Sequence, residues 1–215
     1  MADNPLLLVE GKSDSSVLRE LLKKHNITVV ADENGQEEEI VIKPQDGIDN
    51  LLRSLEQIVK VAENNLGVVV DTDEEIAKIW QRLRDRLQKI GYTNLPLTPL
   101  TEGTIIENEE LPKLGIWIMP DNSLPGKIEE FVKKLVPDKS AELWDFAEET
   151  IENLPLTLFK EKDKTKAQIH TYLAWQKKPG NSMGTAIAAN YFEANKPEAE
   201  QFITWINMLF FLPPS

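Results

Sequence analysis

The segment LLLVEGKSD, residues 6–14, decides the fold class, because a short apolar run meets a glutamate, a glycine and a helix start. Four consecutive apolar residues are typical of a strand buried on both faces of a sheet. Gly11 allows a close turn after this strand, and Ser13 or Asp14 can cap the helix that follows. The segment therefore predicts a strand, a turn and a helix, the first unit of an α/β layered fold.

The same alternation of apolar strand and amphipathic helix continues to about residue 134. Further strands are expected in ITVVA, EIVIK, LGVVVD and GIWIM. The first two flank Asn34-Gly35, a dipeptide typical of tight turns, and are expected to form a hairpin. After Pro137 only helical spacing remains. We therefore expect a mostly parallel sheet flanked by helices in residues 1–137, and a helical extension packed on it in residues 138–215.

The composition narrows the class of protein. The chain has 215 residues, and its lack of cysteine excludes disulfides, zinc–thiolate sites and thiol catalysis. No apolar run approaches the roughly 18 residues of a membrane span, and the first residues do not resemble a signal peptide, so a cytoplasmic location without membrane contact is expected. The net charge of −12 disfavours broad, nonspecific attraction to phosphate backbones.

The letters GKS at residues 11–13 suggest a nucleotide phosphate loop, but the surrounding residues do not fit one. That motif requires a first glycine five residues before the second, where this chain has Leu6. The residues between are the strand itself, and Glu10 would repel a phosphate. We therefore expect a different chemistry at this turn.

Acidic residues follow three of the expected strands, at the edge where ligands bind in parallel α/β sheets. Glu10 ends the first strand, Asp71 and Asp73 follow LGVVV, and Asp121 follows GIWIM. Asp71 and Asp73 are two residues apart, so in an extended segment they point to the same side. Oxygen ligands without histidine or cysteine suit Mg²⁺ or Mn²⁺. The pattern predicts a divalent metal site.

Each acidic residue also has a simpler explanation. An acid after a strand often caps the next helix, as Asp14 and Asp73 can do. Glu129 and Glu130 are interpreted mainly as first-turn acids of a helix, with outer-shell ligation as the alternative. The ordered set, rather than any single member, favours the metal site.

At this point the residues resemble a known pattern. VEG followed by a helix, and then a strand ending in DTD, resembles the Toprim fold of topoisomerases, bacterial primases and OLD-family nucleases. The segments GVVVDTDEE, GIWIMPDN and HTYLAWQKKPGNSMGTAI are similar to those of a group of bacterial Toprim-related proteins, which brings no substrate with it. The Toprim part covers only about the first 125 residues.

The resemblance implies metal-dependent phosphodiester chemistry on nucleic acid. Glu10 matches the family's glutamate, Asp71 and Asp73 match its Asp-x-Asp pair, and Asp14 resembles the second acid of the E-G-x-x-D form. It implies a metal held by Glu10, Asp71 and Asp73, with Asp14 or Asp121 placing a second. Glu10 acting as a general acid or base is the alternative. Hydrolysis by activated water, and so a nuclease, is the smallest mechanism these parts allow.

Candidate contacts to a nucleic acid are basic. Lys12 lies in the first turn, Arg82 and Arg86 share a helix face, and Lys177 and Lys178 flank Trp175 within a lysine-rich stretch that begins at residue 160. The simpler interpretation, which we favour for these positions, is a solvated helix face and a core tryptophan.

Two other functions compete with a nuclease. One is a non-catalytic Toprim-like module that binds Mg²⁺ or a protein, with the aromatic C-terminal helices forming a homodimer or partner surface. The other is a haloacid-dehalogenase-like phosphatase, because DTD after an apolar strand also occurs there. That family places the aspartate on the first strand, where this chain has Glu10, so it ranks last.

Overall fold

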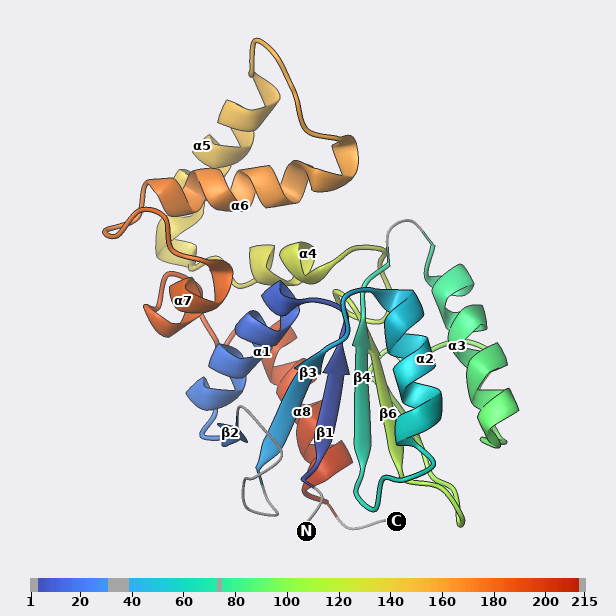
Figure 1. Cartoon of the computed structure of the whole chain (residues 1–215). Coiled ribbons are helices and arrows are strands. Elements are labelled where there is room, and N and C mark those ends of the chain that lie inside the picture. Colours follow the sequence, from blue (N-terminus) through green and yellow to red (C-terminus); the bar gives the residue numbers. More distant parts are fainter. Residues whose placement is uncertain (1–3, 31–38, 73–74, 213–215) are drawn as a thin grey trace.

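A computed structural model describes residues 4–30, 39–72 and 75–212. Its centre is a six-stranded sheet in the order β2-β3-β1-β4-β6-β5 (Figure 1). The strands are β1 (Leu6–Val9), β2 (Val29–Val30), β3 (Ile40–Pro44), β4 (Leu66–Val70), β5 (Thr104–Ile106) and β6 (Leu114–Ile118). Every neighbouring pair is parallel except β5 and β6. The expected α/β fold with a mostly parallel sheet is confirmed; the short antiparallel strand β5 was not predicted.

Helices cover both faces of the sheet. They are α1 (Lys12–Lys24), α2 (Ile48–Ile58), α3 (Ile76–Ile90), α4 (Ile128–Lys133), α5 (Ala141–Glu152), α6 (Lys164–Ala174), α7 (Met183–Ala188) and α8 (Pro197–Phe210). α2 and α3 lie on one face, and α1 and α8 on the other (Figure 1). The strand residues alternate between the two hydrophobic clusters, as in a sheet buried on both sides. Within the described residues, no helix is both long and apolar enough to cross a membrane.

The expectation that residues 27–31 and 39–43 form a hairpin is wrong. β2 and β3 pair in parallel, with Val29 beside Ile40. An Asn-Gly turn forms a hairpin when it directly joins two antiparallel strands. Here β3 is a buried strand that runs parallel to β1, and β2 adds to its outer edge in the same direction. The dipeptide Asn34-Gly35 itself lies outside the described residues.

The C-terminal helices complete the core. The Trp117 ring on β6 lies 5.2 Å from that of Phe202 and 5.6 Å from that of Trp205, both on α8. One hydrophobic cluster joins the sheet to α5, α6, α7 and α8, so packing is continuous across residue 137. Most aromatic side chains of these helices are therefore core residues and form no outer surface.

Two of the C-terminal helices also stand over the carboxyl ends of the strands (Figure 1). We call residues 141–174, which hold α5 and α6, the cap. Beneath it the chain leaves β1 through α1 towards β2 and β3 on one side, and it leaves β4 through α3 towards β5 and β6 on the other. β1 and β4 are therefore neighbours whose connections run in opposite directions, which is where ligand sites form in such sheets.

Gly115 on β6 is a test of the packing against α8. A Cβ at this position would lie 2.5 Å from Leu209 Cδ2 and 2.9 Å from Trp205 Cζ2. We expect Gly115→Ala to lower the free energy of unfolding by about 1–3 kcal/mol, because a packed core has no space for the methyl group. Urea unfolding measures this change. Leu209→Ala removes the nearest atoms, so the double variant should cost less than the sum of the two single changes; strict additivity would contradict this packing.

Candidate functional site

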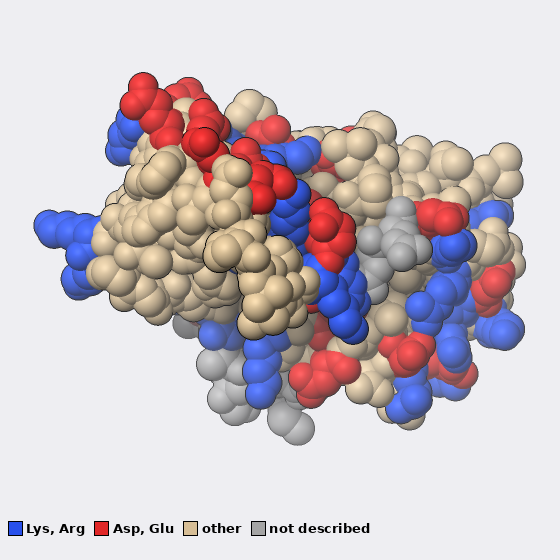
Figure 2. Space-filling model, turned by 90° about the horizontal axis from the view of Figure 1, so that it is seen from above, with Lys and Arg blue, Asp and Glu red and all other residues tan. Residues whose placement is uncertain are grey.

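A cavity of about 520 Å³ lies at the carboxyl ends of β1 and β4. The strand ends, the first turns of α1 and α4, and the cap all contribute to it. Seen from above, on the side of the cap, acidic and basic side chains are interspersed over the surface (Figure 2). The residues that line the cavity are Glu10, Gly11, Lys12, Ser13, Asp14, Asp46, Gly47, Asp71, Lys127, Ile128, Glu129, Glu130, Lys162, Asp163 and Lys166.

Hydrogen bonds hold the ends of β1, β4 and α4 together through two of the predicted acidic residues. The Asp71 backbone N–H donates to Glu10 Oε1 at 3.0 Å. The Ile128 backbone N–H in turn donates to Asp71 Oδ1 at 3.1 Å. Both carboxylates thereby have fixed positions in the cavity, although 61 residues separate them along the chain. The structure thus brings Glu10 and Asp71 together as expected.

The segment before α4 is fixed to the end of β4 by backbone pairing. Thr72 N donates to Gly126 O at 2.7 Å, and Gly126 N donates to Thr72 O at 3.1 Å. Gly126 has a φ of 155°, and a Cβ there would lie 3.0 Å from the Glu130 side chain. Glycine at this position lets α4 begin directly beside Asp71.

Asp14 and Glu129 complete the acidic set, and both are only 7% exposed. The Gly11 backbone N–H donates to Asp14 Oδ2 at 2.7 Å, so Asp14 caps α1 and still lines the cavity. Glu129 lies in the first turn of α4, as interpreted from the sequence. Its negative charge also acts on Asp14 and Asp71. The adjacent Glu130 accepts from the Lys127 backbone N–H at 2.7 Å and is the capping residue. The adjacent pair Glu129-Glu130 was the signal in the sequence: only one of two adjacent acids can cap the helix, so the other is available for the cavity.

The acidic cluster strongly shifts two pKa values. Burial, together with the negative charges of Asp14, Glu10 and Glu129, raises the pKa of Asp71 to about 9. Burial also raises the pKa of Asp14 to about 6, although the Gly11 hydrogen bond opposes this shift. At neutral pH the cavity therefore holds Asp71 protonated, and additional positive charge is needed before all the carboxyl groups can ionise together.

The donor set fits a divalent cation by its chemistry. Carboxylate oxygens are the preferred ligands of Mg²⁺ and Mn²⁺, and a cation would supply the charge that Asp71 lacks. Over residues 4–30, 39–72 and 75–212, however, no three His, Cys, Asp or Glu side chains are already arranged to hold a metal. Asp73, the second acid of the Asp-x-Asp pair, lies outside the described residues.

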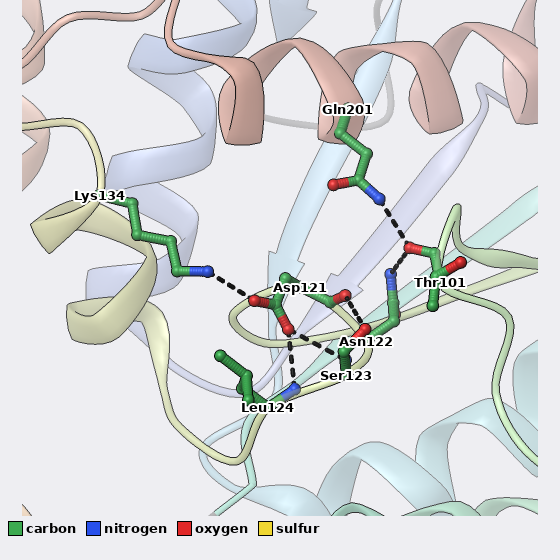
Figure 3. Close-up of polar contacts among 7 residues, drawn as sticks. All are labelled: Thr101, Asp121, Asn122, Ser123, Leu124, Lys134 and Gln201. Carbon is green, nitrogen blue, oxygen red and sulfur yellow. Dashed lines mark hydrogen bonds and ion pairs between the residues drawn. The ribbon is translucent and has the colours of Figure 1, made fainter.

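Asp121 does not join the cavity, contrary to the expectation that it follows its strand as a metal ligand. Its carboxylate accepts from the Ser123 and Leu124 backbone N–H groups and from Lys134 Nζ at 2.5 Å (Figure 3). Partial burial alone would raise the pKa of Asp121, but these donors, Lys134 above all, lower it. Asp121 therefore stabilises the turn after β6, because it follows the strand through a turn that directs it towards α4.

The neighbouring Asn122 explains why this turn is rigid. Asn122 has a φ of 60°, and its side chain accepts from Ile118 N and donates to Thr101 O. Gln201 on α8 donates to the same Thr101 oxygen (Figure 3). The sequence Pro120-Asp121-Asn122 thus joins β6 to α8 and has a structural role.

The predicted basic contacts divide into two groups. Lys12 lines the cavity as expected, and Arg82 lines an adjoining one. Arg86 is paired with Glu56 at 2.6 Å and lines neither cavity, and Lys177 and Lys178 follow the far end of α6. Lys177 and Lys178 lie away from the cavity because α6 is about 16 Å long and only its first turns reach the cavity.

Lysines around the start of α6 and before α4 line the cavity instead of Lys177 and Lys178. Lys127, Lys162 and Lys166 line the cavity, and Lys166 Nζ lies 3.7 Å from Glu129 Oε1. Trp175, expected in the core, is 39% exposed and stacks on Phe146, with ring centroids 5.3 Å apart.

Comparison with known proteins gives the family. Residues 4–211 match the family described as "Protein of unknown function (DUF3226)". The chain belongs to this family. No curated protein and no solved structure matches the chain. The function of this DUF3226 protein therefore has to be argued from its cavity.

The raised pKa of Asp71 makes the stability of the DUF3226 protein depend on pH. The pKa of Asp71 in the folded protein exceeds the ordinary value of 3.8. The contribution of the Asp71 carboxyl group to stability is therefore complete below about pH 4 and is lost as pH rises to about 9. Asparagine cannot ionise. We expect Asp71→Asn to match the wild type near pH 4 and to be more stable at pH 8, by about 1–2 kcal/mol. Thermal unfolding across this range, without divalent cations, measures the difference.

Asp121→Asn is the matched control with the opposite sign. The pKa of Asp121 is lowered in the fold, so its contribution is present at neutral pH and is lost as pH falls below its ordinary value. This variant should therefore be less stable than the wild type at pH 7. An Asp71→Asn protein that is no more stable than the wild type at pH 8 would contradict the proposed state of the cavity.

Proposed function

We propose that this protein is a Toprim-like, metal-dependent nuclease that hydrolyses phosphodiester bonds in nucleic acid. One observation carries the proposal: carboxyl groups at the ends of β1 and β4 and in the first turns of α1 and α4 line one cavity at the switch point of the sheet, where burial and the neighbouring carboxylates raise the pKa of Asp71. A group with a strongly perturbed pKa in a cavity is a candidate for function, because a merely structural role is better served by apolar residues.

Glu10, Asp14 and Asp71 are the proposed ligands for Mg²⁺ or Mn²⁺, with Asp73 as a further ligand from the sequence pattern. When bound, the cation polarises a phosphoryl oxygen and lowers the pKa of water. Binding requires Asp71 to release its proton, so the affinity for the cation rises with pH. Glu129, buried beside Asp14, adds negative charge that favours the cation.

The chain's lysines supply the second part of a phosphodiester site. Lys127 precedes α4, whereas Lys162 and Lys166 come from the cap, so cationic side chains line the cavity from two sides. Ammonium groups at these positions bind phosphate oxygens and offset the charge that develops during transfer. Lys166 also pairs with Glu129, and this contact keeps the cap close to the acidic cluster.

The role of Glu10 has two alternatives that make different demands on its carboxylate. As a ligand it must be ionised and close to the cation, whereas as a general acid or base it must reach a proton of water or of the leaving group. The hydrogen bond from Asp71 N fixes Glu10 at the edge of the acidic cluster and is compatible with both.

A second candidate function is a non-catalytic binding module. It is favoured by exposed apolar side chains on the cap. Leu156 and Leu158, in the segment between α5 and α6, are 70% and 86% exposed, and Phe146 is 56% exposed. Such a patch is typical of a surface that binds another protein.

The deciding experiment is a cleavage panel with purified protein on single- and double-stranded DNA and RNA, with Mg²⁺, Mn²⁺ or EDTA. We expect cation-dependent cleavage that falls about 100-fold or more in Glu10→Gln and Asp71→Asn, because each removes a charge that binds the cation. Asp121→Asn, whose carboxylate lies outside the cavity, should cleave in proportion to its folded fraction.

Calorimetry with Mn²⁺ separates the two candidate functions. Cation binding without cleavage of any substrate would favour the binding module. If the wild type showed neither binding nor cleavage, the proposed carboxylate site would be wrong.

A further inference from the structure

A second cavity, of about 570 Å³, adjoins the acidic one on the side of α2 and α3. Four residues line both cavities: Glu10, Asp71, Lys127 and Lys162. A molecule bound at the carboxylates can therefore extend from one cavity into the other without leaving the protein surface. Each cavity alone has the volume of a small-ligand pocket.

The two cavities differ in charge. Among the residues that line only the first, acids outnumber bases: Asp14, Asp46, Glu129, Glu130 and Asp163 against Lys12 and Lys166. Among the described residues that line only the second, Lys78 and Arg82 outnumber Glu75; Asp73 and Glu74 lie outside the described residues. The first cavity thus suits a cation and the second suits an anion.

The basic residues of the second cavity come from three separate elements. Lys78 and Arg82 lie one turn apart on α3, Lys127 precedes α4, and Lys162 lies in the short 3-10 helix before α6. Basic side chains that converge from distant segments form a more specific anion site than a run of lysines on one exposed helix.

Existing ion pairs do not prevent Lys78 and Arg82 from binding a ligand. Arg82 lies 2.6 Å from Asp49, and Lys78 lies 2.7 Å from Glu75. The side chains in both pairs are 47% to 81% exposed, and exposed ion pairs of this kind contribute little to stability. A phosphate that binds both cations can displace these carboxylates.

We propose that the second cavity binds a backbone phosphate next to the one that is cleaved, with Arg82 and Lys78 as its ligands. This inference rests on the proposed nuclease function and names its substrate class. The substrate is a polynucleotide strand that lies across both cavities, because a strand carries a second phosphate beside the one at the carboxylates. Arg82 and Lys78 are thus positioning residues, since they hold the strand and not the reacting phosphate.

The test compares kcat/KM for a single-stranded oligonucleotide with kcat/KM for bis(p-nitrophenyl) phosphate, which has one phosphodiester and no flanking phosphate. DNA and RNA oligonucleotides are separate arms. In the Lys78→Gln/Arg82→Gln variant we expect the ratio of the two values to fall about 10- to 100-fold, because charge-assisted contacts to the flanking phosphate are lost. The dependence of log kcat/KM on log salt should weaken by ~0.7, because one phosphate contact of a single strand is lost.

Arg86→Gln is the matched control. Arg86 is on the same helix and in a similar ion pair with Glu56, but it lines neither cavity. Its ratio and salt dependence should equal those of the wild type. Asp49→Asn supports the proposal from the other direction if it raises the ratio, since it removes the carboxylate that competes for Arg82.

The outcomes separate the two proposals. A wild type that cleaves neither substrate would overturn the nuclease function itself. A wild type that cleaves both, with an unchanged ratio in the Lys78→Gln/Arg82→Gln variant, would overturn only the flanking-phosphate site. An equal loss in Arg86→Gln would also overturn it, because the effect would then be general electrostatic attraction.

Discussion

Asp71 is hydrogen bonded through both its backbone and its side chain, and this double contact holds together the parts of the cavity. Its N–H fixes Glu10 at the end of β1, and its carboxylate accepts from the first turn of α4. The result is a carboxyl group buried among other carboxyl groups, which a fold selected only for stability would replace with an apolar residue. The pairing of Thr72 with Gly126 keeps α4 in place, so the acidic cluster cannot relax by moving apart.

The C-terminal helices serve this cavity in two ways. α8 covers one face of the sheet with Phe202, Trp205 and Leu209, and this fixes the strands whose ends carry the acids. The cap instead supplies Lys162 and Lys166 from above the carboxyl edge, and the contact of Lys166 with Glu129 joins the cap to α4. Most of the acidic residues that line the cavity thus come from the sheet and the helices that follow its strands, whereas the cap supplies Lys162, Lys166 and Asp163. Charge in the cavity depends on how these two parts of the chain pack.

The sequence predicted most of the sheet because its central strands are continuous apolar runs, a strong local signal. The meeting of Glu10 and Asp71 also followed from local rules, since parallel strands end at the same edge, whereas Asp14 was expected at the site from the resemblance. Asp121 does not join the acidic cluster as predicted, because its position depends on the turn after Met119. In this turn Asn122 adopts a φ of 60° and the Asp121 carboxylate pairs with Lys134. Glu129 was given as an outer-shell ligand only as the alternative, and Lys166 only as part of a lysine-rich stretch, because their contact joins segments far apart in the chain, which no local pattern reveals. The Asn-Gly signal was equally local, and the parallel pairing of β3 with β1 overrode it.

The position of α8 has a consequence for how the protein is made. Gly67 and Gly115 lie against Leu209, so the middle of the sheet keeps one apolar face uncovered until the ribosome has passed residue 210. From the synthesis of β6 until α8 follows, the nascent chain must carry Trp117 and its neighbours without these partners, a state prone to aggregation.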